Sequence, residues 1–161
     1  RSEREGIVLP IFAPHALDFI QMVMGDEDPV HVRAVAIREQ SNWAGEDEAR
    51  AILRYPDRRL AYMHVSYNQR PFFKRKTMLF DNCIVEVIND SEVRVDGKVI
   101  ATGSEAMTSE QLAKRAFESQ FEEFARAVRG LPHRSVLHKE GMRQIRTLHA
   151  IRREAATFPI T

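Results

Sequence analysis

The spacing of apolar residues predicts a helix near the start of the chain. Leu17, Ile20 and Met24 recur at the spacing of one helical face, and a proline and a glycine bracket the stretch that contains them. Proline suits the first helical position, and glycine suits the left-handed residue that follows a helix. We therefore expect a first helix over Pro14–Met24.

Two further helices are expected in the last third of the chain, over Ser109–Arg129 and Lys139–Ala155. Each has an apolar stripe at helical spacing. The stripe of the second helix consists of Leu112, Ala116, Phe117, Phe121, Phe124 and Val128. The inward positions of the third helix are Met142, Ile145, Leu148, Ile151 and Ala155, and its basic outer face carries Arg143, Arg146 and Arg153. We interpret this basic face as a solvated surface rather than as a nucleic-acid site.

Between the helices, short segments rich in Val and Ile predict strands joined by short connections. The expected strands are Val30–Ile37, Ala49–Tyr55, Leu60–Tyr67, Thr77–Phe80, Ile84–Ile88, Val93–Val95 and Lys98–Ala101, with a last edge strand at Phe158–Thr161. Pro56-Asp57-Arg58 and Asp96-Gly97 are turn signals, and the second is typical of a tight hairpin. Consecutive strands with short connections indicate a largely antiparallel sheet and an α+β fold.

The strand Leu60–Tyr67 is mildly apolar on both faces. One face carries Leu60, Tyr62, His64 and Ser66, and the other carries Ala61, Met63, Val65 and Tyr67. A sheet with helices on one side normally presents charged residues to water on the other. We infer that another chain or another domain covers the second face. The alternative is a mildly apolar face that stays open to water.

Length and composition favour a single globular domain, residues 1–161, with two very small domains as the alternative. Lys plus Arg number 24 and Asp plus Glu number 23, so a net charge of +1 provides no global field for nucleic acid or an acidic membrane. The only cysteine, Cys83, excludes an internal disulfide and favours a reducing, cytoplasmic setting. Secretion is the alternative, because Arg1 and Arg4 precede an apolar run, but no small-residue cleavage site follows. That run also contains two prolines and an aspartate, so it is a poor transmembrane helix.

Motifs for nucleotides and metals are missing from the sequence. It contains no GxGxxG, GxxxxGK[ST], GxSxG or HExxH, and no Cys/His cluster with zinc spacing. We therefore expect neither a cofactor-binding nor a metal-binding residue in this chain.

His15 is the candidate catalytic residue. It follows Pro14 in the first turn of the expected helix, where the peptide dipoles favour a neutral imidazole that can accept a proton. Asp18 lies three residues further on and is placed to orient the ring. The alternative interpretation is that His15 packs against neighbours and that Asp18 is a first-turn acid that stabilises the dipole.

Residues 6–25 read GIVLPIFAPHALDFIQMVMG, and they resemble the start of the C-terminal domain of the Gfo/Idh/MocA oxidoreductases. That segment of the family reads about as G-G-x-L-x-D-x-G-x-H-x-x-D before a helix. The later order of strands, hairpin and two helices is also similar, including Phe121–Gly130, so the resemblance covers nearly the whole chain. The family includes relatives of glucose–fructose oxidoreductase and inositol dehydrogenase.

The resemblance implies an open, mostly antiparallel mixed sheet with helices on one face. It also implies the substrate-binding and oligomerisation half of an NAD(P)-dependent oxidoreductase acting on a sugar, polyol or related hydroxy compound. NAD or NADP would be bound mainly by an N-terminal Rossmann domain that this chain lacks, so the chain alone would not be active. The outer sheet face would join it to itself as a dimer or tetramer.

His15 and Asp18 match the histidine and the second acid of the family motif, and they are the catalytic candidates. The family's catalytic aspartate, four residues before the histidine, is Ile11 here. This departure favours the alternative of a non-catalytic dimerising or ligand-binding module that kept the fold.

Arg70, Lys74 and Tyr67 are the candidate substrate-binding residues. The two cations lie in a connecting segment that also contains two phenylalanines, and Tyr67 ends the preceding strand. In relatives this region lies near the substrate mouth, which implies contact with a phosphate or carboxylate. A solvated loop is the alternative.

Overall fold

The chain folds as two compact units in the computed structural model, which describes residues 8–39, 45–103, 109–135 and 138–156. Arg1–Gln69 and Val136–Thr161 form the first unit, and Arg70–Ser135 forms the second. The edge strand expected at Phe158–Thr161 lies outside the described residues.

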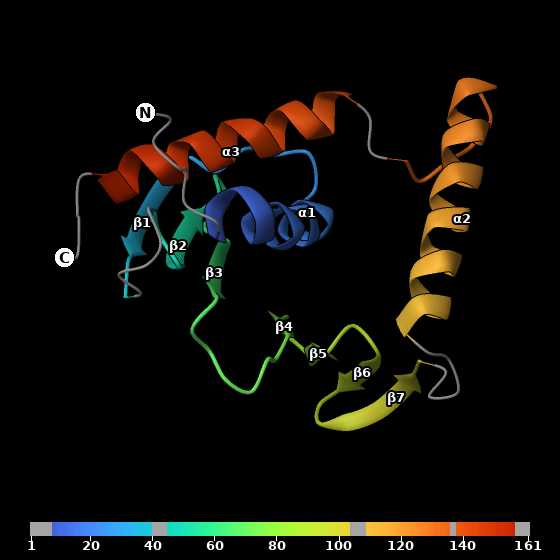
Figure 1. Ribbon diagram of the computed structural model, residues 1–161, viewed down its shortest axis with the longest axis horizontal. Coiled ribbons are helices and arrows are strands. Elements are labelled where there is room, and N and C mark those ends of the chain that lie inside the picture. Colours follow the sequence, from blue (N-terminus) through green and yellow to red (C-terminus); the bar gives the residue numbers. More distant parts are fainter. Residues whose placement is uncertain (1–7, 40–44, 104–108, 136–137, 157–161) are drawn as a thin grey trace. The chain divides into compact units, whose positions relative to one another are not determined.

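The first unit is a three-stranded antiparallel sheet covered on one face by two helices (Figure 1). The strands are β1 (His31–Ile37), β2 (Glu48–Arg54) and β3 (Leu60–Ser66), in that order across the sheet. The helices are α1 (Ala13–Met24) and α3 (His138–Ala156), and a π-helical turn, η1 (Val8–Phe12), leads directly into α1. The helices expected on one face of a sheet are therefore present in this unit.

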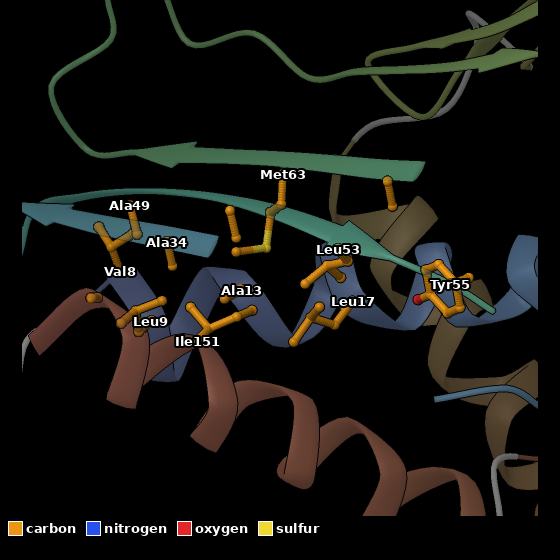
Figure 2. Close-up of a cluster of buried hydrophobic side chains, with 13 residues drawn as sticks. Val8, Leu9, Ala13, Leu17, Ala34, Ala49, Leu53, Tyr55, Met63 and Ile151 are labelled. Carbon is orange, nitrogen blue, oxygen red and sulfur yellow. The ribbon is translucent and has the colours of Figure 1, made fainter. Parts of the chain in front are cut away.

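Alternation along the strands determines which side chains enter the core. The register places Ala34 opposite Ala51, and Ala49 and Ala61 are also buried, so small residues line much of the inner face. Small side chains on a sheet allow helices to approach closely. Figure 2 shows how Leu17 of α1 and Ile151 of α3, both fully buried, meet this face.

The second unit contains a four-stranded antiparallel sheet and helix α2 (Ser109–Val128). The strands, in order across the sheet, are β4 (Arg75–Leu79), β5 (Ile84–Ile88), β6 (Glu92–Val95) and β7 (Lys98–Thr102). Asp96 and Gly97 join β6 to β7 with φ values of 50° and 78°, which confirms the hairpin predicted from these residues. The turn predicted after Tyr55 is also present, closed by the Arg58 N–H, which donates to the Tyr55 carbonyl at 3.1 Å.

The predicted α+β class is confirmed, and every strand pair in the described residues is antiparallel. The strands divide into two sheets rather than forming one. Residues 67–74 separate β3 from β4, and this connection contains Pro71, which lacks a backbone donor. It is also longer than the loops that usually join neighbouring antiparallel strands.

The third helix departs from its predicted faces. Ile151 and Ala155 are buried as expected, but Met142 and Ile145 are exposed. The side chain of Arg143, expected on the solvated outer face, is only 14% exposed. Three acids follow α1 at residues 26–28, and two of them, Asp26 and Asp28, bind this guanidinium together with the carbonyl of Gly25 just after α1.

The apolar stripe of α2 is solvent-exposed in the described structure. Phe117, Phe121, Phe124 and Val128 are between 60% and 72% exposed. The amphipathic pattern predicts the helix correctly, but it does not identify a surface that the stripe contacts.

Candidate functional site

His15 lies on the exposed face of α1, but it is not at the start of the helical backbone. The backbone is already helical from Val8, whereas the sequence places the helix start at Pro14. In a π-helix each carbonyl accepts from the N–H five residues later, so the carbonyls of η1 face the first N–H groups of α1. The free helix N-terminus on which the predicted dipole effect depends is therefore not present beside His15.

Asp18 is also exposed on α1, one helical turn after His15. Among the contacts of the described residues, no hydrogen bond or ion pair joins these two side chains. The structure thus places both catalytic candidates on the same exposed helix surface without a contact between them. Ile11, four residues before His15 and on the same side of the helical segment, is exposed as well.

Tyr67 lies beside the helical segment that carries His15. Its ring is 5.8 Å from that of Phe12, at an interplanar angle of 51°, and Phe12 precedes His15 by three residues. This tilted geometry is typical of favourable aromatic pairs. Of the candidate substrate-binding residues, Tyr67 is the one that the structure brings next to the turn before His15. Phe12 was not predicted as a site residue, although its i−3 spacing from His15 was a usable signal.

Three consecutive acids at the start of β2 connect this part of the unit. Glu46 Oε1 accepts from the Leu9 N–H at 3.2 Å and so holds η1. Asp47, only 1% exposed, accepts from the Glu39 N–H and from Asn68. These acids were also missed, because a run of charges normally indicates a solvated turn.

Glu48, the third acid, lies on the outer face of the sheet and is mostly buried. Arg50 contacts its Oε1 at 2.6 Å, Ser66 Oγ donates to its Oε2 at 3.0 Å, and His64 Nε2 lies 3.2 Å from Oε1. Burial raises the pKa of Glu48, but the hydrogen bonds from Arg50 and Ser66 and the Arg50 charge outweigh it, so the pKa lies below its ordinary value.

Arg70 and Lys74, the other two substrate-binding candidates, belong to the second unit. The Lys74 Nζ is 3.0 Å from the Asp90 carboxylate and 5.8 Å from the ring centre of Phe72. Lys76 also binds Asp90. Burial raises the pKa of Asp90, but these two lysines lower it more, so the net shift is downward. The charge of Lys74 is therefore already shared with a carboxylate.

The described residues provide no obvious place for a metal or a nucleotide. No group of three or more His, Cys, Asp or Glu side chains among them is arranged to hold a metal ion. Their sheets are antiparallel and lack the parallel strand, glycine-rich loop and helix that cradle a dinucleotide, so these residues do not fit NAD(P). No described helix is long and apolar enough to cross a membrane.

These features define an α+β domain in which α1 packs on one face of an antiparallel sheet. Because α1 carries the exposed His15, we call it the histidine helix. The family model of the GFO/IDH/MocA C-terminal domain matches residues 1–85, more than half of the chain, and the chain belongs to this family. A search of curated proteins found no match.

Solved structures share the fold at low sequence identity. UDP-N-acetylglucosamine 3-dehydrogenase GnnA from Acidithiobacillus ferrooxidans is 18% identical, with a TM-score of 0.74 over 94% of this chain and 48% of that protein. Aldose-aldose oxidoreductase from Caulobacter crescentus, complexed with glycerol, is 19% identical, with a TM-score of 0.71 over 94% and 46%. The WlbA dehydrogenase from Bordetella pertussis, in complex with NADH and UDP-GlcNAcA, is 18% identical, with a TM-score of 0.64 over 92% and 43%. The chain spans slightly less than half the length of these proteins.

Proposed function

We propose that this chain is the substrate-binding and oligomerisation half of an NAD(P)-dependent oxidoreductase that acts on a sugar, polyol or related hydroxy compound. The observation that carries the proposal is the exposed His15, one turn after an aromatic pair, in a chain of the GFO/IDH/MocA C-terminal domain family. The names of the similar solved structures, two of which act on sugars, support this substrate class. The single cysteine favours a cytoplasmic protein.

In this proposal His15 exchanges the proton of the reacting substrate hydroxyl. A neutral imidazole at an exposed position accepts such a proton at neutral pH. Phe12 and Tyr67 offer an apolar aromatic surface next to it, which suits the C–H face of a sugar ring. Asp18 supports the helix or orients the ring, and Arg70 and Lys74 contact an anionic part of the substrate. Hydride transfer belongs to the nicotinamide cofactor, for which another part of the complete protein supplies the site.

The proposal is tested in the complete protein with NAD+ and NADP+ and a panel of aldoses, polyols and UDP-sugars. His15→Ala should lower kcat by about 10²- to 10⁴-fold, the usual contribution of a general acid–base. His31→Ala is the matched control, because His31 is an exposed histidine on β1 of the same unit. A loss of less than a few-fold for His15→Ala would refute the catalytic role.

A non-catalytic dimerising or ligand-binding module is the second candidate, and Ile11 favours it. An apolar side chain stands where the resemblance implies an acid, and it lies one helical turn before His15. Under this alternative the natural protein shows no turnover on the panel. If the missing acid is the reason, Ile11→Asp should confer turnover, because a carboxylate four residues away is within reach of the imidazole. Turnover by the natural protein would exclude this candidate.

We also propose that the outer face of the β1–β3 sheet mediates self-association into a dimer or tetramer. Ile52, Leu60 and Tyr62 are exposed there, and the register places Ile52 directly opposite Tyr62. Contiguous exposed apolar side chains on a sheet are typical of an association surface.

A further inference from the structure

We propose that Asp47 and Asn68 are positioning residues for Tyr67 and, through its ring, for the helical turn that precedes His15. This inference rests on the proposed function, because it assigns a role to residues that support the same site.

The first step is the burial of the Asp47 carboxylate. It is 1% exposed, and both its oxygens accept the Glu39 N–H at 3.1 Å, while Oδ1 also accepts from Asn68 Nδ2 at 2.9 Å. A carboxylate withdrawn from water is stable only when donors surround it. The donors that satisfy it come from the end of β1 and from the segment after β3, so Asp47 fixes both segments to the start of β2.

The second step is that Tyr67 is held on both sides. Its own N–H donates to the Asp47 carbonyl at 2.8 Å. The residue after it, Asn68, is bound by Asp47, and the Asn68 N–H donates to Ser66 Oγ at 3.1 Å. Ser66, the residue before Tyr67, donates its hydroxyl to Glu48. The backbone that carries the Tyr67 side chain therefore has little freedom to rotate.

The third step connects Tyr67 to the histidine helix. Its ring contacts Phe12 of η1, and the N–H of Leu9, also in η1, donates to Glu46. Glu46 thus holds η1, which carries Phe12, and the adjacent Asp47 holds the backbone of Tyr67. Because hydrogen bonds fix both sides, the separation of the Tyr67 ring from the turn before His15 is set by Glu46 and Asp47.

A purely structural role for Asp47 would be to close the β1–β2 connection through Glu39 alone. A structural role and a positioning role predict different effects of removing the Asn68 side chain. If Asn68 only stabilises the fold, its removal lowers stability without a selective effect on Tyr67. If Asn68 positions Tyr67, its removal frees the Tyr67 ring in particular.

The test uses the complete protein labelled with fluorotyrosine. This chain contains three tyrosines, and Tyr67→Phe identifies the Tyr67 resonance. Asn68→Ala should shift and sharpen that resonance while those of Tyr55 and Tyr62 stay in place. Asn68→Asp should broaden or split it, because the variant replaces the amide that donates to Asp47 with a second carboxylate that repels it. The exchanged pair Asp47→Asn with Asn68→Asp restores a donor opposite an acceptor and should return the resonance toward its original position. Asn82→Ala, an exposed asparagine of the other unit, is the control.

The kinetic readout separates binding from chemistry. With the most active substrate of the panel, Asn68→Ala should raise KM by about three- to tenfold, the effect of one lost hydrogen bond, with a smaller change in kcat. Combined with Tyr67→Ala it should add nothing further, because both changes remove the same contact.

An unmoved Tyr67 resonance in Asn68→Ala, or full additivity with Tyr67→Ala, would overturn the positioning role. If the resonance moves but His15→Ala and Tyr67→Ala leave turnover unchanged, the proposed function fails instead, and the coupling between Asn68 and Tyr67 stands.

Discussion

Glu48 lies on the outer face of the first sheet, where neighbouring side chains stabilise its negative charge. Its side chain is only 9% exposed, and a buried carboxylate is normally unfavourable unless donors compensate for the lost water. Arg50 and Ser66 provide those donors, and His64 approaches the same carboxylate. The pKa of Glu48 is lowered because the folded chain stabilises the charged form of the carboxyl over the neutral form.

The sign of the pH effect follows from that direction. Because the folded pKa lies below the unfolded value, the charge of Glu48 stabilises the fold above the ordinary carboxyl pKa of about 4.3. This contribution is lost as the pH falls through the lower, folded pKa. Glu48→Gln should therefore reduce the free energy of unfolding by about 1–3 kcal/mol at pH 7, and by much less at pH 3.

Urea unfolding at both pH values measures this difference. Glu122→Gln, an exposed acid on α2, is the control and should change stability little at either pH. An equal loss for Glu48→Gln at pH 7 and pH 3 would show that the charge of Glu48 is not what stabilises the fold.

The residues of the candidate site were only partly predictable from the sequence. His15 and Asp18 were proposed because a short motif and a helical spacing contain them. Asp47 was not found, since its partners Glu39 and Asn68 lie 8 and 21 residues away and only the paired strands bring them together. Local patterns cannot show which of several consecutive acids turns inward.

At the scale of elements, α1 carries the candidate residues His15 and Asp18 and also contributes the buried Ala13 and Leu17 to the core of the first unit. Leu17 is fully buried two residues after the exposed His15, because helical positions two residues apart face nearly opposite sides. Figure 2 shows Leu17 next to Leu53 of β2 and Ala13 of its own helix. The burial of this face therefore determines the orientation of the exposed face.

Leu17→Ala should lower the free energy of unfolding by about 2–5 kcal/mol, because it removes buried methyl groups and leaves a cavity. Met22→Ala, on the same helix but 71% exposed, should change it by less than about 0.5 kcal/mol. Chemical denaturation monitored by circular dichroism provides both values. Similar values for the two variants would contradict the packing of α1 described above.

Most element boundaries follow from periodicity and turn residues, but η1 does not. Pro10 suggests a break, whereas the backbone through it is π-helical, because Pro10 lies in the first turn of the helical segment, where backbone N–H groups have no acceptor within the helix. The inward side of Arg143 was also unpredictable, because its partner Asp26 is 117 residues away. The division of the strands into two sheets depends on how a long connection runs, which residue patterns do not encode.

At the scale of the whole molecule, ion pairs as well as packing join α3 to the segment that follows α1 in the first unit. Arg143 of α3 binds the Gly25 carbonyl at 3.3 Å and Asp26 and Asp28 at 3.2 and 3.4 Å. Arg146 binds Asp28 as well, at 3.1 Å. These contacts bring the last described helix onto the end of α1, so the histidine helix is supported by residues from both ends of the sequence.

The covered and open faces of the first sheet have different roles in the proposed assembly. The inner face is filled by α1 and α3, so in the proposed assembly the second copy contacts the outer face, where Tyr62 is 61% and Ile52 is 48% exposed. Aromatic side chains near the centre of an apolar patch usually contribute most to such an interface. Tyr62 lies in the central row of that face, opposite Ile52, which in turn lies opposite Arg33.

Tyr62→Glu should therefore weaken self-association of the complete protein by at least about tenfold in Kd, since a buried, unpaired carboxylate opposes contact between two apolar faces. Light scattering coupled to size exclusion, over a range of protein concentrations, measures the change. Leu79→Glu places the same charge at an exposed apolar position of the second sheet and is the control. If the natural protein is a monomer, or if both variants dissociate equally, the outer face of the first sheet is not the association surface. Dissociation by Tyr62→Glu alone would assign the assembly to the face opposite the histidine helix, leaving His15 accessible to substrate in the assembled protein.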